Sequence, residues 1–119
     1  MAQKKGFVNE NFEAVLNIKL SDGATIDCVL DTGFNGTLIL PREFTEENAI
    51  LPFSRVQVDL VEDKTAEIDV ASAEVQWLGE EVSINILVSE TDEALIGTQM
   101  LIDAILEIDY KNLTVKITK

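Results

Sequence analysis

Apolar and polar residues alternate through most of this 119-residue chain, and a two-residue period is typical of β-strands with one face on a core. The clearest case is residues 14–20. The turn Ser21-Asp22-Gly23 follows and leads into a second alternating segment, 25–30. We expect further strands at residues 37–40, 55–61, 65–78, 82–88, 94–96, 106–110 and 113–117. The sequence therefore predicts a mostly β protein.

Helical signals are few. Residues 98–105 predict one short C-terminal helix, with Thr98 at its N-cap and Leu101 and Ile105 at helical spacing. Residues 41–48, which begin with Pro41, are long enough for one or two helical turns. No linker or low-complexity segment divides the chain, so we expect a single domain over residues 1–119 with a core of about 12–117.

Charge and composition exclude several classes of function. The chain has 22 acidic and 9 basic residues, a net charge of −13 that repels nucleic acids and anionic membranes. It has no histidine and one cysteine, Cys28, which excludes an internal disulfide and Ser-His or Cys-His catalysis and argues against zinc. We expect Cys28 to pack in the core, and we expect neither a metal nor a cofactor.

The first residues and the hydropathy favour a cytoplasmic protein. Met-Ala-Gln-Lys-Lys-Gly leads into no apolar segment of the kind that a signal peptide has. No run approaches the roughly 18 apolar residues of a membrane span. The sequence therefore predicts no membrane partner and a reducing environment.

Asp31-Thr32-Gly33 is the motif with the most chemical content. It joins the apolar segment 26–30 to a second apolar segment, 38–41. Because Asp and Gly are common turn residues, a plain turn is one interpretation. The other is a protease site, which needs a carboxylate in a cleft, a hydroxyl that locks the loop and a glycine where substrate approaches the backbone.

A second motif favours the protease interpretation. Residues 94–101, Ala-Leu-Ile-Gly-Thr-Gln-Met-Leu, place two large apolar residues and Gly97 directly before the predicted helix. In this order the two motifs resemble those of retropepsin-like aspartic proteases. Asp31-Thr32-Gly33-Phe34-Asn35-Gly36 before an apolar run and Pro41 is similar to the prokaryotic single-domain branch, as are Val75-Gln76-Trp77-Leu78-Gly79 and a terminal hairpin with Asp109.

The resemblance implies a fold and a set of site residues. The fold would be the acid-protease fold, with closed, barrel-like β-sheets, one short C-terminal helix and one lobe per chain. Asp31 would be catalytic, Thr32 would bond across a dimer axis, and Gly33 would offer its carbonyl to substrate. A flap at about residues 56–70 would cover the cleft with its tip at Glu62-Asp63-Lys64-Thr65. The residues implied to contact substrate are Gly33, Phe34, Asn35, Asp63, Lys64, Thr65, Leu95 and Ile96.

Aspartic protease chemistry predicts a homodimer for a chain of this kind. It needs two carboxylates that share one proton, and this sequence has only one Asp-Thr-Gly. The second Asp31 must then come from another copy across a twofold axis, with a peptide or protein as substrate. The sequence thus predicts a homodimeric aspartic endopeptidase.

Two alternatives stay open at this stage. One is a retropepsin-like domain that binds peptides or dimerises with little catalysis, because Phe34 replaces the small residue common in the family and the predicted flap tip lacks glycine. The other is an acidic β domain that binds cations, although no EF-hand spacing is present.

Overall fold

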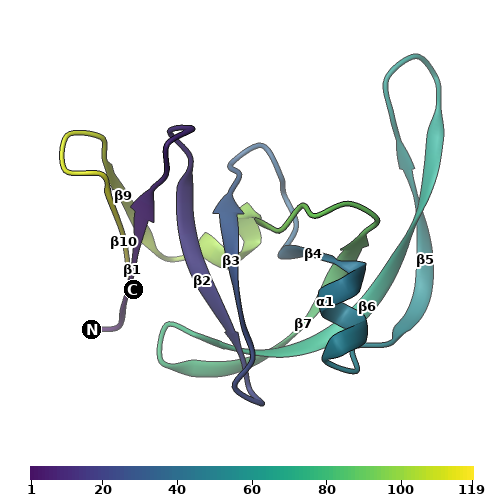
Figure 1. Ribbon diagram of the computed structural model, residues 1–119, viewed down its shortest axis with the longest axis horizontal. Coiled ribbons are helices and arrows are strands. Elements are labelled where there is room, and N and C mark those ends of the chain that lie inside the picture. The colour runs from purple at the N-terminus through teal and green to yellow at the C-terminus, as the bar shows by residue number, and fades with distance from the viewer.

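The computed structural model describes all residues, 1–119, and is built almost entirely from β-strands (Figure 1). Its elements are β1 (Gln3–Val8), β2 (Ala14–Leu20), β3 (Thr25–Leu30), β4 (Leu38–Pro41), α1 (Arg42–Glu47), β5 (Pro52–Asp59), β6 (Thr65–Trp77), β7 (Glu80–Ser89), β8 (Leu95–Ile96), the 3-10 helix η1 (Thr98–Leu101), β9 (Ile105–Asp109) and β10 (Thr114–Thr118). The mostly β class predicted from the alternation is confirmed.

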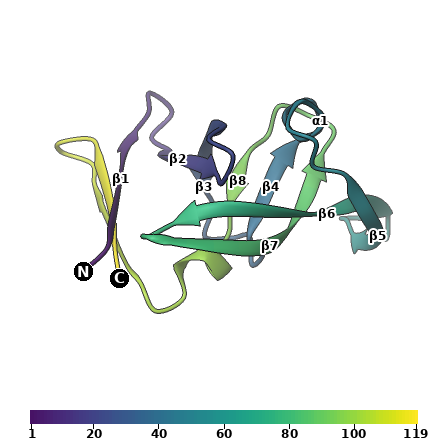
Figure 2. The ribbon, with the colours of Figure 1, turned by 90° about the horizontal axis from the view of Figure 1, so that it is seen from below.

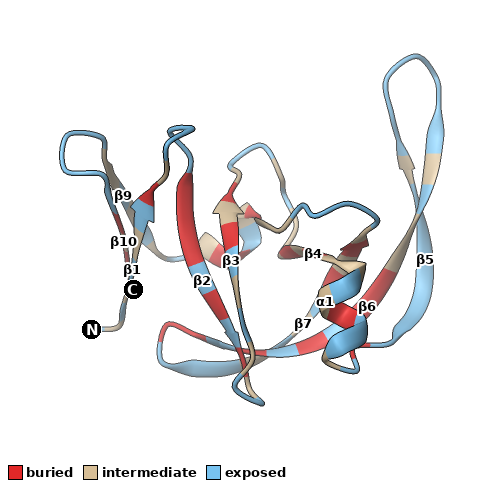
Figure 3. Cartoon of the chain, viewed as in Figure 1, coloured by how far each residue is buried: buried red, intermediate tan, exposed pale blue.

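Six of the strands close into a barrel. The ten strands pair in the order β5-β6-β7-β4-β8-β3-β2-β1-β10-β9, and β6 also pairs with β2. That additional pairing, Leu20 with Val75 and Lys19 with Gln76, closes the ring β2-β3-β8-β4-β7-β6. The inward positions of these strands form one apolar core, in which Leu16, Ile18, Leu38, Leu40, Ile86 and Ile96 are fully buried. Figure 3 shows this buried material on the central strands.

The predicted pattern of strand faces is confirmed by burial. Along β2, the alternating set Leu16, Ile18 and Leu20 faces the core, and Cys28 on β3 is completely buried. Burial raises the pKa of the Cys28 thiol to about 12, so this cysteine is a packing residue that stays protonated.

Two features extend from the barrel. On one side β5 and the first half of β6 form a long hairpin that projects away from the body (Figure 1). Glu62 and Asp63 at its tip have φ values of +61° and +57°, a left-handed geometry that glycine usually provides. On the other side β1, β10 and β9 form a three-stranded sheet with both chain termini at its lower end.

The structure corrects the sequence prediction in two places. The helix expected at 98–105 is only the 3-10 turn Thr98–Leu101, without a side-chain cap from Thr98, and Ile105 begins β9. The regular helix is α1, within the segment expected to form one or two turns. Strand β1 was not predicted; its backbone pairs with β10 from Gln3 to Phe7. None of the helices is long and apolar enough to cross a membrane.

A network of ion pairs fixes the base of the projecting hairpin to the barrel. Arg42, at the start of α1, bonds Asp69 of β6 at 2.8 Å and also pairs with Glu90 after β7. Arg55 of β5 donates to the other oxygen of Asp69 at 2.9 Å. Its hydrogen bond with Arg42 is the main reason that the pKa of Asp69 lies below its usual range, and the same holds for Glu90.

This network should make stability depend on pH in a predictable direction. A carboxylate with a lowered folded pKa stabilises the fold above its unfolded pKa of about 4, and that contribution is lost as pH falls through the folded value. We expect Arg42→Gln to lower the free energy of unfolding at pH 7, by an amount that shrinks towards zero below pH of about 4. Urea unfolding at a series of pH values measures this, with Lys64→Gln, which removes an unpaired cation on the same hairpin, as the control. A pH-independent effect of Arg42→Gln would contradict it.

Candidate active site

Asp31 lies where β3 ends, and β8 fixes the backbone around it. β8 lies between β3 and β4, parallel to the first and antiparallel to the second (Figure 2). The amide of Asp31 donates to the carbonyl of Ile96 at 2.9 Å, and the amide of Gly97 donates to the carbonyl of Thr37 at 2.7 Å. The two sequence motifs are therefore in contact. Residues 95–97 of the second motif lie between β3 and β4, the two strands that flank the Asp31 loop of the first.

The loop after Asp31 is held by its own backbone. The Asp31 carboxylate accepts a hydrogen bond from the amide of Gly33 at 2.8 Å, and its carbonyl accepts one from the amide of Phe34 at 3.1 Å. The carbonyls of Phe34 and Gly36 in turn accept bonds from the amides of Thr98 and Gln99, at 2.8 and 3.1 Å. The loop is thus fastened to the start of η1, so the direction of the Asp31 side chain is set by main-chain bonds.

Phe34 packs against two glycines. A Cβ atom at Gly36 would lie 2.5 Å from Cζ of Phe34, and one at Gly97 would lie 2.7 Å from Cδ2 of the same ring. The Gly97 Cβ would also lie only 2.1 Å from the carbonyl oxygen of Gly36. Phe34 therefore packs against the loop and has no hydroxyl to offer the Asp31 carboxylate, and Asn35 makes no side-chain bond to Asp31 either.

A surface hollow of about 390 Å³ opens beside Asp31. Loops from three parts of the chain surround it: the β1–β2 turn, the segment before β8 and the end of β9. Its lining consists of Phe12, Glu13, Ala14, Val29, Leu30, Asp31, Thr32, Glu93, Leu95, Ile108 and Tyr110. Seven of the eleven lining residues are hydrophobic and three carry carboxylates, and their polar and apolar surfaces are about equal. Such a lining suits part of an extended peptide.

The structure brings some of the predicted site residues together and leaves others apart. Asp31, Thr32 and Leu95 share the hollow, whereas Ile96 is fully buried behind the loop and Gly33 and Asn35 are exposed on its outer side. Asp63 and Lys64, with Thr65, lie at the far end of the projecting hairpin, well away from the Asp31 loop in this chain (Figure 1). Their contact with a substrate stays a prediction.

The sequence did not reveal Phe12, Glu13, Glu93 and Tyr110 as lining residues. Phe12 has a φ of +61° and its side chain is 72% exposed; Tyr110 is 58% exposed. The only sequence feature that could have indicated these residues is the presence of an aromatic side chain, Phe12 or Tyr110, in each of two turns. Nothing in the linear sequence places those turns beside Asp31.

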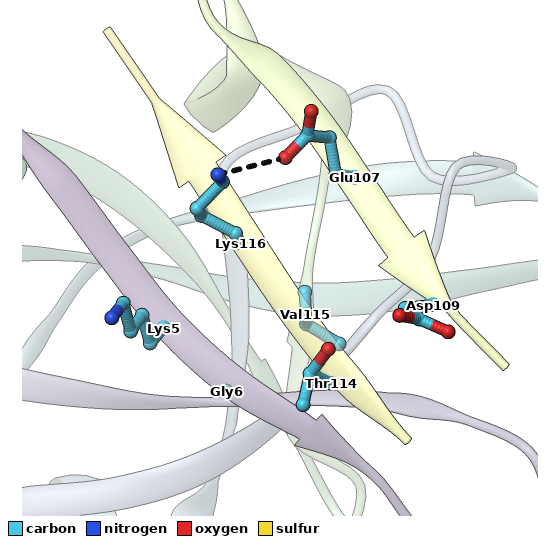
Figure 4. Close-up of a pocket in the computed structure, with 7 residues that line it drawn as sticks. All are labelled: Lys5, Gly6, Glu107, Asp109, Thr114, Val115 and Lys116. Carbon is cyan, nitrogen blue, oxygen red and sulfur yellow. Dashed lines mark ion pairs between the residues drawn. The ribbon is translucent and has the colours of Figure 1, made fainter. Parts of the chain in front are cut away.

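A second hollow, of about 360 Å³, lies on the β1-β10-β9 sheet (Figure 4). Lys116 reaches across it to Glu107 at 3.1 Å, and Lys5 lies on the neighbouring strand. None of its residues belongs to the Asp31 loop, and only one of its seven lining residues, Val115, is hydrophobic. No group of three or more Asp, Glu, His or Cys residues in the chain is arranged to hold a metal ion.

Comparison with solved structures identifies the fold. A retropepsin-like aspartic protease from Rickettsia conorii superposes with a TM-score of 0.71 at 17% identity, over 97% of this chain and 89% of that one. EIAV protease, solved with the inhibitor HBY-793, gives 0.60 at 17% over 80% of this chain and 90% of that one. The protease of simian foamy virus gives 0.56 at 18%, over 73% and 90%. No family model matches the sequence, and no curated protein is similar to it.

The chain therefore has the retropepsin-like aspartic protease fold, and the resemblance drawn from its motifs is confirmed at that level. At these identities the similarity shows the fold alone. The assignment to a prokaryotic branch stays a prediction, because no family model matches.

Proposed function

We propose that this protein is a homodimeric aspartic endopeptidase whose catalytic group is Asp31. The observation that carries the proposal is the position of the Asp31 carboxylate. It is oriented by a main-chain bond at the end of a barrel strand and opens onto a hollow with seven hydrophobic residues in its lining, in a fold shared with aspartic proteases. A fixed carboxylate beside a peptide-sized hollow suits water-activated hydrolysis.

In the proposed reaction two Asp31 carboxylates share one proton. Two carboxylates about 3 Å apart cannot both ionise, so one is protonated and the other is not. The ionised carboxylate takes a proton from a water molecule, which attacks the peptide carbonyl, while the protonated one donates a hydrogen bond to the carbonyl oxygen. The carboxyl group that took the proton from water then passes it to the amide nitrogen, and the peptide bond breaks to give a free amine and a carboxylic acid without a covalent intermediate. The two pKa values belong to the pair and not to either residue.

The surface around Asp31 is compatible with a second copy at this place. Thr32 and Gly33 are exposed, and the Thr32 hydroxyl has no partner within its own chain. We propose that this hydroxyl bonds across the twofold axis and that Gly33 offers its carbonyl to substrate. β10 already pairs with β1 on one edge and β9 on the other, so a partner strand has no free edge there. Contact between copies would use the Asp31 loops and the open edges of β5 and β9.

The β5–β6 hairpin is proposed to act as the flap over the paired site. It projects from the body, and several exposed apolar side chains lie along it, namely Phe53, Val56, Leu60 and Val61. In a dimer these side chains, with Asp63, Lys64 and Thr65 at the tip, would contact substrate or the other copy. Phe34, Asn35 and Leu95 complete the proposed cleft, and Ile96, which is fully buried, supports it from behind the Asp31 loop.

A domain that binds peptides or dimerises without turnover is the second candidate function. Two observations favour it. The Phe34 side chain supplies no hydrogen bond to the Asp31 carboxylate, and the glycine-free tip holds Glu62 and Asp63 in a left-handed geometry that restricts its movement. Such a domain would bind peptides with the same affinity whether residue 31 is Asp or Asn.

Dilution tests the dimeric mechanism. If each active site needs two chains, the cleavage rate per chain should fall as the protein is diluted below the dissociation constant of the dimer. Adding excess Asp31→Asn protein to a fixed amount of wild type should also lower the rate, because mixed dimers keep only one carboxylate. The measurement is the initial rate on a mixed peptide library, with sedimentation at the same concentrations. A rate per chain that is independent of dilution and unaffected by the variant would exclude the dimer.

A further inference from the structure

The hollow beside Asp31 combines an apolar lining with carboxylates and lacks a cation. Its side chains include the rings of Phe12 and Tyr110 and the aliphatic groups of Val29 and Leu95, whereas Glu13 and Glu93 supply negative charge at its rim. No lysine or arginine lines it. This combination fits a side chain with an apolar stem and a positively charged end.

Both rim glutamates are available to a ligand. Glu93 takes part in no ion pair, and only its backbone amide is bonded, to the Thr91 hydroxyl at 3.2 Å. Glu13 accepts one bond from the Asn9 amide group at 3.1 Å and has no cationic partner, so its other oxygen is free. Like most acidic residues of this chain, neither glutamate forms a salt bridge; only Asp69, Glu67, Glu90 and Glu107 pair with Lys or Arg.

The turns that carry the rim are held in place by local hydrogen bonds. The Asn9 side chain accepts bonds from the amides of Asn11 and Glu13 at 3.0 and 2.9 Å, and the Asn9 carbonyl accepts one from the amide of Phe12. On the other side, Asp109 accepts bonds from the backbone amide and the side chain of Asn112 and from the amide of Lys111. These bonds lower the pKa of Asp109 and close the turn that presents Tyr110. The two aromatic rings and Glu13 are therefore presented by ordered turns.

We propose that this hollow is a specificity subsite for an arginine or lysine side chain next to the cleaved bond, with Glu13 and Glu93 as the specificity residues. The aliphatic stem would lie on Val29 and Leu95, the cation would reach the two carboxylates, and the rings of Phe12 and Tyr110 add cation–π attraction. Because Asp31 itself lines the hollow, the residue bound there lies beside the scissile peptide. The proposal rests on the proposed function for the position of the cleaved bond and names the substrate class.

The test separates binding from cleavage. Fluorescent peptides that differ at one position, arginine against the uncharged isostere citrulline, are titrated into Asp31→Asn protein, which keeps both glutamates. Anisotropy should show the arginine peptide binding about fivefold more tightly at low salt, the size expected for two exposed ion pairs, with a preference that falls as salt rises. Glu13→Gln and Glu93→Gln should each reduce the preference and together remove it. Glu81→Gln, an exposed glutamate at another surface, is the matched control.

NMR locates the bound side chain. Cleavage of a mixed peptide library by the wild type shows separately whether the protein is a protease. Methyl shifts of Val29, Leu95 and Ile108 should move on titration with the arginine peptide. Equal affinity for the two peptides, or a preference that survives the double variant, overturns the subsite proposal even if cleavage occurs. Arginine-selective binding that both glutamates support, without cleavage by wild type, sustains the subsite and defeats the protease proposal.

Discussion

Asp31→Asn is expected to abolish peptide hydrolysis while leaving the fold intact. The amide cannot take a proton from water, and loss of a general acid or base costs about 10²–10⁴ in rate. The Asn oxygen can still accept the Gly33 amide bond that orients residue 31. The measurement is the initial rate of cleavage of a mixed peptide library across acidic and neutral pH, with circular dichroism and the melting temperature of both proteins.

The control for Asp31→Asn lies on β3, the strand that leads to Asp31. Asp27 on β3 is exposed and accepts a bond from Asn17 at 3.0 Å, so Asp27→Asn makes the same chemical change away from the loop. We expect its cleavage rate to match wild type. If Asp31→Asn cleaves peptides as fast as Asp27→Asn, the catalytic role of Asp31 is wrong, and the peptide-binding alternative is then the better account.

Gly97→Ala should be the most destabilising single-methyl change in the chain's active-site region. The added Cβ would lie 2.1 Å from the carbonyl oxygen of Gly36 and 2.7 Å from its carbonyl carbon, so backbone must move. That movement breaks the short bond from the Gly97 amide to the Thr37 carbonyl. We expect a loss of at least about 3 kcal/mol in the free energy of unfolding, the upper end of the cost of overpacking, measured by urea titration.

Gly23 and Gly36 serve as controls, because an added Cβ destabilises each of them for a different physical reason. Gly23→Ala meets no atom within 4 Å but has a φ of +102°, so it isolates backbone strain, at about 1–2 kcal/mol. The three atoms nearest to a Cβ at Gly36 all belong to the Phe34 ring, so Phe34→Leu should relieve Gly36→Ala, which a double-mutant cycle detects. Phe34→Leu should not rescue Gly97→Ala, because the Gly36 carbonyl remains. A Gly97→Ala protein as stable as wild type would show that the loop is not clamped as described.

The strands were predictable because their alternation is local. The apolar-polar alternation in residues 14–20 and 65–78 arises because one face of each strand lies on the core. The alternation is the same whichever strand pairs with it. The alternation in β1 is weaker because Val8 is its only buried residue. This strand is held mainly by backbone bonds to β10, which lies at the other end of the chain. Residues 102–105 were predicted wrongly as helix because their apolar spacing is helical. Asp103 instead adopts a φ of +62° and Ile105 pairs with Thr118.

The sequence by itself determined most of the strands, though not β1, and which carboxylate is followed by a turn and a glycine, since both depend on neighbours in the chain. Only the tertiary structure decided that β8 passes between β3 and β4, so that Ile96 and Gly97 bind the backbone of the Asp31 loop. It also brought Phe12, Glu93 and Tyr110 to the hollow beside Asp31. Strand order and loop convergence follow from burial of a shared core among segments far apart in sequence, and no local pattern encodes which of those segments meet.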